Sequence, residues 1–438
     1  LRRAFELLGE DDPRARALRA RVRLARLLAA RDETRRGIDD PEDAAEAKLA
    51  DLEARNPRLV DLRDEAVEDF RIAAAGVDDP AEQELCEAQI SYLRGEWEEV
   101  CRSAESSLDT RVTAEGYWLA GIARLAQLEG LSIDEQLPAH FAMIESSIRY
   151  LDAATAVGRG FVEAWAARAE AKAKWIEYRR HEIIDRIEAD VSQWAGDDDR
   201  ERADAAARSL ADAVALEEAI ESAFEAARRA QRNGADPKRI ARLIGELAWM
   251  GGEFARKTRA ARQLAGSPTD VPKLLEPYIV ELERLDPRYQ DHVVLFYLGK
   301  LWDCHAISGT GLVDTTPELR KAIAYHDRSL ARAPNFQRGY FWRANVKYEL
   351  ALALVELGGD ARPVFESAIA DYDRANQGND WVVIYRGVNR YRLAELDRRE
   401  GRPAEDRFRQ ALVDLEPHDV PEALACRGFV KIYLSAAA

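Results

Sequence analysis

A short basic phrase recurs along the chain and is its clearest candidate for chemistry. An arginine is followed by a small residue, and a second base comes three positions after the small one, in residues 168–172, 343–347, 386–390 and 427–431. Gly121 and Arg124 form a weaker copy without the first arginine. Guanidinium and ammonium groups donate charge-assisted hydrogen bonds to carboxylates and phosphates. The phrase can therefore hold anions, either within this chain or on a partner.

The second base of each phrase has two interpretations. The bases form a ladder that binds acidic peptide tails or phosphate groups, or each base pairs with a carboxylate on the neighbouring helix, such as Asp371, Asp373 or Asp414, and fixes the stacking register. The chain contains 80 acidic and 64 basic residues, which favours the internal pairing. The bases concerned are Arg124, Lys172, Lys347, Arg390 and Lys431.

The segments that must position these phrases are predicted to be helices. Ala, Leu, Arg and Glu dominate, only 25 Gly and 16 Pro are present, and Gly-rich hairpin turns are missing. Repetition at a period of about 20–50 residues indicates a stacked array of helices. The connections are short, so neighbouring helices are expected to pack antiparallel. The sequence therefore predicts an all-α protein.

Caps and helix breakers give the expected bounds. Thr316 is expected to cap a helix with Pro317 in its first position, and Gly358 is expected to end the next one. In the helix at 290–305, Tyr297 and Lys300 are assigned to the small-residue and base positions. The expected helices span residues 13–31, 42–55, 59–74, 82–93, 96–108, 161–194, 201–232, 271–286, 290–305, 316–333, 335–357, 361–376, 380–400, 403–415 and 421–434.

Composition limits the partners. The formal net charge of -16 argues against nucleic acid as a general partner, because such a binder needs a basic surface to displace counterions. The locally basic segment 228–262 is either a solvated helix face or an anionic docking site. No run reaches the roughly 18 apolar residues of a membrane span, and no signal peptide precedes the first helix. We therefore expect no membrane partner and a cytoplasmic location.

Signals for catalysis and metal binding are weak. Adjacent residues on a helix point about 100 degrees apart, so Cys304 and His305 cannot form a nucleophile and base pair locally. The four cysteines and the isolated histidines lack the spacing of a disulfide framework or a zinc site. We expect no enzyme activity, no cofactor and no metal. An enzyme site on the helix of Cys304 and His305 is a third hypothesis, which burial of Cys304 excludes.

The pattern resembles the tetratricopeptide repeat (TPR), a helix-turn-helix unit of about 34 residues. Residues 92–100 look like the turn between the two helices of such a unit. The family's small and bulky positions are matched by Ala322, His326, Ser329 and Pro334, by Ala368, Tyr372 and Ala375, and by Ala404, Phe408 and Ala411. The repeats diverge from the family, because Ala344, Gly387 and Gly428 are 43 and 41 positions apart and a base stands where the family usually has Tyr.

The resemblance implies an α-α superhelix, a TPR-like solenoid of antiparallel helix pairs with lengthened helices in the middle. It divides the chain into an N-terminal helical capping region at 1–78, TPR-like repeats at 79–195, a long-helix insertion within the solenoid at 196–270 and C-terminal TPR-like repeats at 271–438. In such repeats the first helix of each unit lines the concave face. This implies a peptide groove at Phe341, Asn345, Tyr348, Ile384 and Tyr391, unless these residues only fill the space between units.

The expected function is a non-catalytic scaffold that binds a peptide or protein on its concave face, as the regulatory or docking part of a larger signalling protein. The alternative is a sensor arm that gates an attached enzyme domain. Similar long repeats resemble the regions that follow the catalytic domain in some bacterial serine/threonine kinases. The chain itself has no kinase Gly-rich loop, His-Arg-Asp or Asp-Phe-Gly. The residues do not indicate the partner's identity or the oligomeric state.

Overall fold

The computed structural model describes residues 12–36, 49–130, 133–193, 204, 206–207, 210–266, 269–285, 287–308, 314–376 and 378–437. Within these ranges every regular element is a helix, which confirms the predicted all-α class. The chain divides into two compact units, which we call unit 1 (residues 1–251 and 260–266) and unit 2 (residues 252–259 and 267–438). The boundaries that the sequence suggested at residues 78, 195 and 270 stay predictions.

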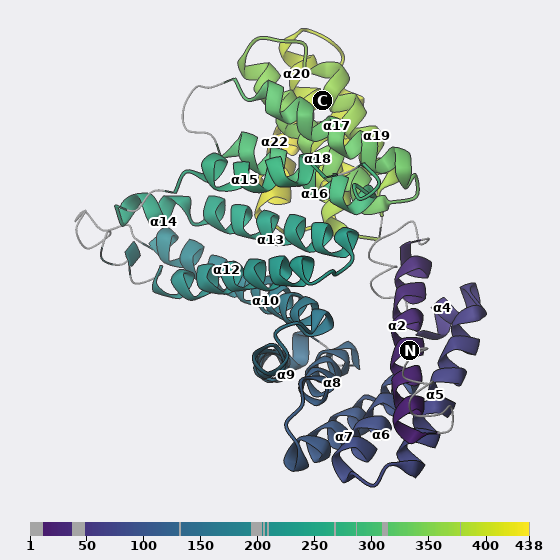
Figure 1. The fold of residues 1–438 in the computed structure, drawn as a ribbon. Helices are drawn as coiled ribbons and strands as arrows, with labels where there is room; N and C mark the ends of the chain where they lie inside the picture. The colour runs from purple at the N-terminus through teal and green to yellow at the C-terminus, as the bar shows by residue number, and fades with distance from the viewer. Residues whose placement is uncertain are drawn as a thin grey trace. The chain divides into compact units, whose positions relative to one another are not determined.

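Unit 1 is built from antiparallel helix pairs. Its pairs are α2 with α5, α6 with α7, α8 with α9, and α10 with α12, and Figure 1 shows α10 and α12 running side by side. The expected lengthening in the middle of the chain is confirmed by α10, which has 32 residues. The helices are α2 (Pro13–Arg36), α4 (Leu49–Arg55), α5 (Arg58–Gly76), α6 (Pro80–Arg94), α7 (Trp97–Thr110), α8 (Ala114–Ala126), η1 (Gln127–Gly130), α9 (Ile133–Val157), α10 (Val162–Gln193) and α12 (Ala211–Arg232).

Two further helices, α13 (Pro237–Lys257) and α14 (Arg259–Leu264), contribute residues to both units. Together with the end of α12, they carry the basic segment 228–262 predicted from the sequence. Arg239 pairs with Glu170 of α10 at 2.7 Å, and Arg262 pairs with Glu217 of α12. Part of this segment is therefore neutralised by neighbouring carboxylates, and both interpretations of the segment stay predictions.

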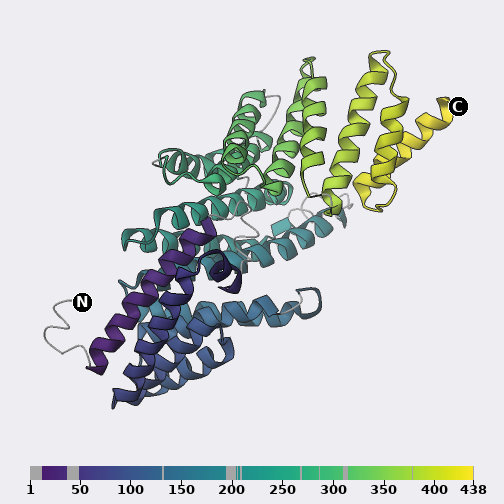
Figure 2. The same cartoon turned by 90° about the vertical axis from the view of Figure 1, so that its right-hand side faces the viewer.

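Unit 2 continues the alternation. Its pairs are α16 with α17, α18 with α19, and α20 with α21, and α22 packs on α20 and α21. Figure 2 shows these green to yellow helices standing side by side. The helices are α15 (Val271–Glu283), α16 (His292–Ile307), α17 (Thr316–Arg332), α18 (Gln337–Glu356), α19 (Arg362–Arg374), α20 (Asp380–Arg399), α21 (Glu405–Leu415) and α22 (Pro421–Ala437).

We call the leading member of each pair a first helix and the other a second helix. The first helices of unit 1 are α2, α6, α8 and α10, and those of unit 2 are α16, α18, α20 and α22. Consecutive first helices from α6 to α10 lie beside one another in unit 1, and those from α16 to α22 do so in unit 2. This pairwise stacking is the solenoid arrangement that the repeats predict.

Local chemistry explains several helix ends. Gly95 takes a left-handed conformation with φ of 74° and closes α6 before α7 begins, and Gly358 does the same after α18 with φ of 70°. The predicted cap at Thr316 is wrong. Thr316 is the first residue of α17, and its backbone N–H donates to Asp314 Oδ1 at 2.9 Å. The longer reach of an aspartate two positions upstream replaces the predicted threonine cap.

Small residues in the basic phrase let paired helices approach closely. A Cβ atom added at Gly387 of α20 would lie 2.8 Å from the Leu415 side chain of α21, and one added at Gly121 of α8 would lie 2.7 Å from Leu151 of α9. Gly428 of α22 differs, because nothing lies within 4 Å of its added Cβ. The same phrase therefore packs tightly in α20 and stays open in α22.

These two glycines provide a matched test of the packing. Gly387→Leu is expected to lower the free energy of unfolding by about 1–3 kcal/mol, because the new side chain overpacks the contact with α21. Gly428→Leu is expected to leave it unchanged or to raise it by up to about 1 kcal/mol, because leucine favours helices and meets open space. Urea denaturation of both variants measures the difference. Equal losses in the two variants contradict the tight packing at Gly387.

Within the described residues, no helix combines the length and the apolar character needed to cross a bilayer.

Candidate functional site

Both bases of the phrase in α18 bind one buried carboxylate. Arg343 donates from Nε and Nη2 to the two oxygens of Asp371 on α19, at 2.8 and 2.5 Å. Lys347 Nζ contacts the same carboxylate at 2.6 Å and also donates to Ser367 Oγ at 2.8 Å. Asp371 is buried. A carboxylate removed from water needs such charge-assisted partners, so both bases of the phrase act on the following second helix.

The phrase of α20 repeats this arrangement on α21. Arg386 donates from Nε and Nη2 to Asp414 at 3.0 and 2.8 Å, and Arg390 Nη1 donates to Asp414 Oδ2 at 2.7 Å. Asp414 is also buried. Arg386 additionally pairs with Asp373 of the preceding second helix, α19, at 3.1 Å. In the same way Arg343 pairs with Asp327 of α17 at 2.6 Å.

Arg343 and Arg386 therefore each bridge the second helices on both sides. We call the two bases with their shared aspartate a charge clamp. The pairing interpretation of the sequence is confirmed at Lys347 and Arg390, whose carboxylates are among those it named. The anion ladder stays a prediction, and a ligand on it must compete with these aspartates.

The remaining copies are looser. Arg124 pairs with Glu105 of α7 at 2.9 Å. Lys172 of α10 donates to Ser222 Oγ of α12 at 2.9 Å, as Lys347 does to Ser367 Oγ. Burial lowers the pKa of Lys172, as it lowers that of Lys347. Lys431 of α22 pairs with the exposed Glu416 at 3.4 Å.

The copy of the basic phrase that the sequence predicted at Tyr297 and Lys300 is wrong by two positions. The residue of α16 that meets α17 closely is Gly299, because a Cβ added there would lie 2.7 Å from the His326 ring. Lys300 is buried instead against aromatic rings, with Nζ 3.9 Å from the centre of Trp342 and 5.2 Å from that of Phe296. It makes cation-π contacts and takes no clamp position.

The predicted peptide-groove residues divide into two groups. Ile384 and Tyr391 are buried within clusters of α20, α21 and α22, which is the space-filling role that the sequence left as the alternative. Phe341, Asn345 and Tyr348 of α18 are half-buried. The structure therefore leaves accessible surface on the second group, and the groove itself stays a prediction.

The half-buried group forms one face of α18, because its residues are three or four positions apart. Phe341 packs edge-on against Tyr372 with ring centres 6.1 Å apart, and Tyr348 lies 6.3 Å from Phe365. Asn345 Oδ1 accepts a hydrogen bond from the Tyr372 hydroxyl at 2.5 Å. The oxygen of Asn345 is thus engaged, and its amide nitrogen is the group that can donate to a ligand carbonyl.

An acid pair that sequence reasoning missed borders this face. Asp303 of α16 is 9% exposed, and its Oδ1 has no hydrogen-bond partner in the described part of the chain. Burial and the nearby Glu349 of α18 raise the pKa of Asp303 to about 7, against the lowering effect of Arg256 and Lys300. Burial also raises the pKa of Glu349. The two acids lie on neighbouring first helices but far apart in the sequence, so no local pattern joins them.

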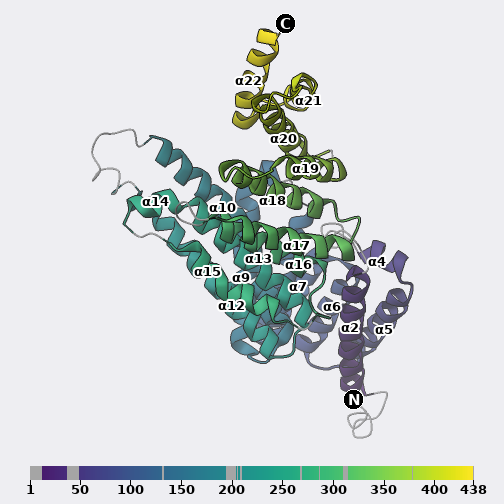
Figure 3. The same cartoon turned by 90° about the horizontal axis from the view of Figure 1, so that it is seen from above.

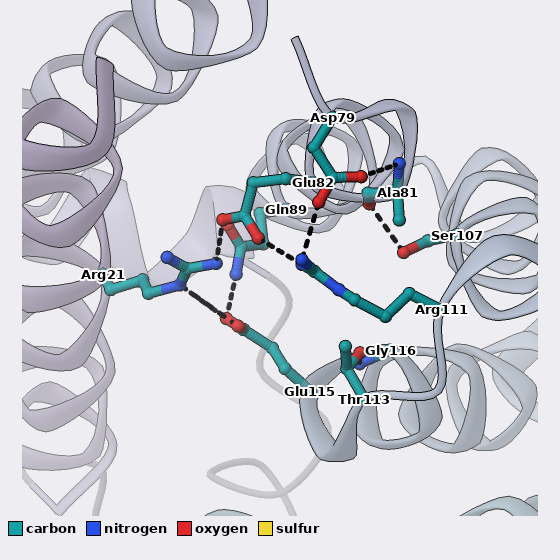
Figure 4. Close-up of polar contacts among 10 residues, drawn as sticks. All are labelled: Arg21, Asp79, Ala81, Glu82, Gln89, Ser107, Arg111, Thr113, Glu115 and Gly116. Atoms are coloured by element: carbon teal, nitrogen blue, oxygen red, sulfur yellow. Dashed lines mark hydrogen bonds and ion pairs between the residues drawn. The ribbon is translucent and has the colours of Figure 1, made fainter. Parts of the chain in front are cut away.

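Unit 1 carries another network, in which acids and arginines from different helices bond to one another (Figure 4). Arg21 of α2 donates to Glu82 of α6 at 2.7 Å and to Glu115 of α8 at 3.1 Å, and Arg111 donates to Glu82 at 2.7 Å. Burial raises the pKa of Glu82, but hydrogen bonds from Arg21 and Arg111 outweigh it and the pKa is lowered. The network ties three first helices together.

The cysteine hypothesis is excluded. Cys304 is buried, and burial raises the pKa of its thiol to about 12. Its sulfur lies 3.9 Å from Ser308 Oγ, whereas the ring of His305 packs against Trp302. A thiol that does not ionise near neutral pH is a poor nucleophile. Among the described residues, no group of three or more His, Cys, Asp or Glu side chains is arranged to hold a metal ion.

Removing a clamp aspartate tests how far the clamp stabilises the fold. Asp371→Ala is expected to lower the free energy of unfolding by about 3–5 kcal/mol, because it leaves Arg343 and Lys347 without their buried counter-charge. The matched variant Asp373→Ala, on the same helix but exposed, is expected to cost no more than about 1 kcal/mol. Guanidinium denaturation of both variants makes the comparison, and similar losses contradict the clamp.

Stability against pH tests the environment of Asp303. A carboxyl whose folded pKa is raised to about 7 contributes stability below its unfolded pKa, and this stability is lost as the pH rises through 7. Asp303→Asn is therefore expected to unfold like the wild type near pH 4. At pH 8 it is expected to be more stable by about 2–4 kcal/mol, since one pKa unit corresponds to about 1.4 kcal/mol. Denaturation of both proteins from pH 4 to 8 gives the difference, and a constant difference across this range contradicts the raised pKa.

No family model matches the chain, and no curated protein matches it. Similar solved structures include the C-terminal part of a TPR repeat-containing protein from Cytophaga hutchinsonii, at 12% identity over 83% of this chain and 94% of that chain, with a TM-score of 0.33. The APC/C hetero-tetramer Cut9-Hcn1 has 14% identity over 98% of this chain and 80% of that chain, with a TM-score of 0.33. The human IFIT1 dimer with PPP-AAAA has 12% identity over 93% of this chain and 94% of that chain, with a TM-score of 0.27. Likenesses at these TM-scores decide no partner or activity for this chain.

Proposed function

We propose that the chain is a protein-interaction scaffold that holds a peptide segment on the first helices of unit 2. The binding face comprises Phe341, Asn345, Tyr348 and Glu349 of α18, together with Asp303 of α16. The bound segment carries a lysine or arginine. Such a scaffold serves as the docking or regulatory part of a larger signalling protein.

The observation that carries this proposal is the acid pair. Burying a carboxylate without a hydrogen-bonding partner is costly, and a nearby second carboxylate adds repulsion. The free protein meets this cost by holding the pKa of Asp303 near 7. A lysine or arginine of a partner supplies the missing donor and the counter-charge together, so binding relieves a penalty that folding leaves in place.

The neighbouring residues suit the rest of a peptide. Tyr348 and Phe341 offer half-buried aromatic surface for apolar side chains. The amide nitrogen of Asn345 can donate to a peptide carbonyl while its oxygen stays bonded to Tyr372. Because these side chains are already held by packing within α18, α19 and α20, the face needs little ordering on binding.

Charge supports a protein partner over nucleic acid. The net charge of -16 repels a polyanion, and the acid pair adds negative charge at the proposed face. A sensor arm acting on an enzyme domain, the sequence-based alternative, can use the same face with a segment of that domain as its ligand.

A displayed library of random seven-residue peptides, selected on the full chain at pH 8, tests the proposal. We expect the selected peptides to be enriched in Lys or Arg next to an apolar residue. Asp303→Asn and Glu349→Gln are each expected to weaken a selected peptide at least tenfold in isothermal titration calorimetry. Glu356→Gln, an exposed acid on the same helix, serves as the matched control and is expected to bind like the wild type.

The affinity for the peptide is expected to rise with pH. Only the ionised Asp303 attracts the basic side chain, so a pKa of about 7 predicts binding about tenfold tighter at pH 8 than at pH 6. This dependence is expected to disappear in Asp303→Asn. The proposal is wrong if the selected peptides lack a basic residue. It is also wrong if neither Asp303→Asn nor Glu349→Gln changes their affinity. A single-stranded RNA oligonucleotide that binds with higher affinity than any selected peptide also overturns it.

A further inference from the structure

A row of aromatic rings extends the proposed peptide face from α18 to α20. The ring centres of Trp381 and Tyr385 on α20 are 5.9 Å apart, and those of Tyr385 and Phe341 on α18 are 6.2 Å apart. The two first helices are neighbours, and Figure 3 shows them in succession along the stack. We call these three rings the aromatic row. It begins at Phe341, which the proposed peptide face already includes.

The aromatic row is accessible from outside. Trp381 is 45% exposed, and Tyr385 and Phe341 are half-buried. The helix that carries Trp381, α20, contacts a first helix before it, α18, and another after it, α22. Trp381 is therefore exposed although its helix has both of its neighbours in the stack. Because tryptophan and tyrosine rings bury a large apolar area, they are frequent in the residues that dominate binding at protein interfaces.

The helical backbone limits how a peptide can be held on this surface. The N–H and C=O groups within α18 and α20 bond inside each helix, so they cannot pair with an added strand. An extended peptide that lies on these helices must therefore leave its own backbone groups in water. A polyproline II segment does so at no cost, because it has no internal hydrogen bonds and its prolines have no N–H.

We propose that the aromatic row binds a proline-rich segment in the polyproline II conformation, and that this segment continues into the basic residue held by Asp303 and Glu349. The segment is the peptide of the proposed function, so its assignment rests on that function. Proline rings pack on the flat faces of aromatic rings, and a segment that is ordered before binding loses little conformational entropy. Charge favours the same partner, because the two acids attract a cation and repel the phosphates of a nucleic acid.

The length of α18 between its aromatic and acidic ends sets the spacing of the segment. Phe341 and Glu349 are eight positions apart, which corresponds to about 12 Å along a helix. A polyproline II segment covers this distance in about four residues, at roughly 3.1 Å per residue. Asn345 lies midway on α18, and its amide nitrogen can donate to a carbonyl of the segment between the two ends. The expected ligand therefore carries a Lys or Arg four positions from its nearest proline.

Two octapeptides of opposite chain direction test this spacing. They are Lys-Ala-Ala-Ala-Pro-Pro-Pro-Pro and Pro-Pro-Pro-Pro-Ala-Ala-Ala-Lys, each labelled with fluorescein and titrated with the full chain at pH 8. Fluorescence anisotropy is expected to show saturable binding of at least one of them. Moving its lysine next to the prolines is expected to weaken binding at least fivefold, because the lysine and the prolines then cannot reach both ends of the face. Replacing the four prolines by alanine is expected to weaken it at least tenfold.

Variants of the protein test the aromatic row itself. Trp381→Ala is expected to weaken binding of the proline peptide at least tenfold, whereas Trp381→Phe keeps a ring and is expected to retain most of the affinity. Val413→Ser, at a position that is 72% exposed on the second helix α21, is the matched control and is expected to bind like the wild type. Because Trp381 is exposed in the first turn of α20, its variants are expected to keep the wild-type circular dichroism spectrum and Tm.

Several outcomes overturn a proline-rich ligand. One is no binding of either octapeptide up to about 1 mM, and another is an affinity that Trp381→Ala leaves unchanged. Peptides with leucine in place of the four prolines that bind as tightly assign the row to a helical or other apolar ligand. A uridine octanucleotide that binds more tightly than both peptides, and more weakly to Trp381→Ala, assigns it to stacked RNA bases. Sedimentation that shows a dimer, abolished by Trp381→Ser, assigns it to self-association.

Failure of the aromatic row and failure of the proposed function give different results. If only the row is wrong, peptides selected from the random library respond to Asp303→Asn and Glu349→Gln but not to Trp381→Ala. If the acid pair is wrong, the octapeptide responds to Trp381→Ala but keeps its affinity in Asp303→Asn. The second result overturns the proposed function and the link between the row and the acids together.

Discussion

Two cations on one buried aspartate set the distance and register between neighbouring helices in unit 2. Asp371 and Asp414 are each held by two bases of the preceding first helix. Removing a carboxylate from water costs several kcal/mol, and only close, hydrogen-bonded cations repay it. If one helix shifted along the other, the buried aspartate would lose its two cations. The clamp therefore disfavours every register except one. The small residue beside the first arginine completes the constraint, because it lets the carboxylate reach both bases.

The clamp also explains how one helix pair is joined to the next in the stack. Arg343 and Arg386 each reach the second helices on both sides, so the pairs from α17 to α21 are linked in series. Unit 1 achieves a similar linkage with other residues, since Arg21 joins α2 to α6 and α8 through Glu82 and Glu115. The buried Asp303 carboxyl departs from this pairing of charges, because its Oδ1 has no hydrogen-bond partner among the described residues. Local departures from a consistent pattern are where function is expected.

Helix positions could be predicted from the sequence because the signals are local. Glycine, proline and capping residues act within one turn, and the predicted helices at 161–194 and 380–400 agree with α10 and α20 within one residue at each end. The errors arose where several local choices compete. Asp314 displaced Thr316 as the hydrogen-bond acceptor at the start of α17, and Gly299 displaced Tyr297 as the residue that meets the next helix. The second of these choices depends on the rotational phase of α16, which packing against α17 decides.

The sequence by itself determined the all-helical class, the repetition and the presence of bases three positions after small residues. These features depend on residue type and spacing, which the chain carries locally. The tertiary structure alone decided which acids meet those bases, that Asp303 and Glu349 lie together, and that Tyr391 is buried while Ile432 is exposed. The physical reason is that burial and electrostatic pairing are properties of the neighbouring helix. Two residues in equivalent positions of the same phrase differ when one has a covering helix and the other does not.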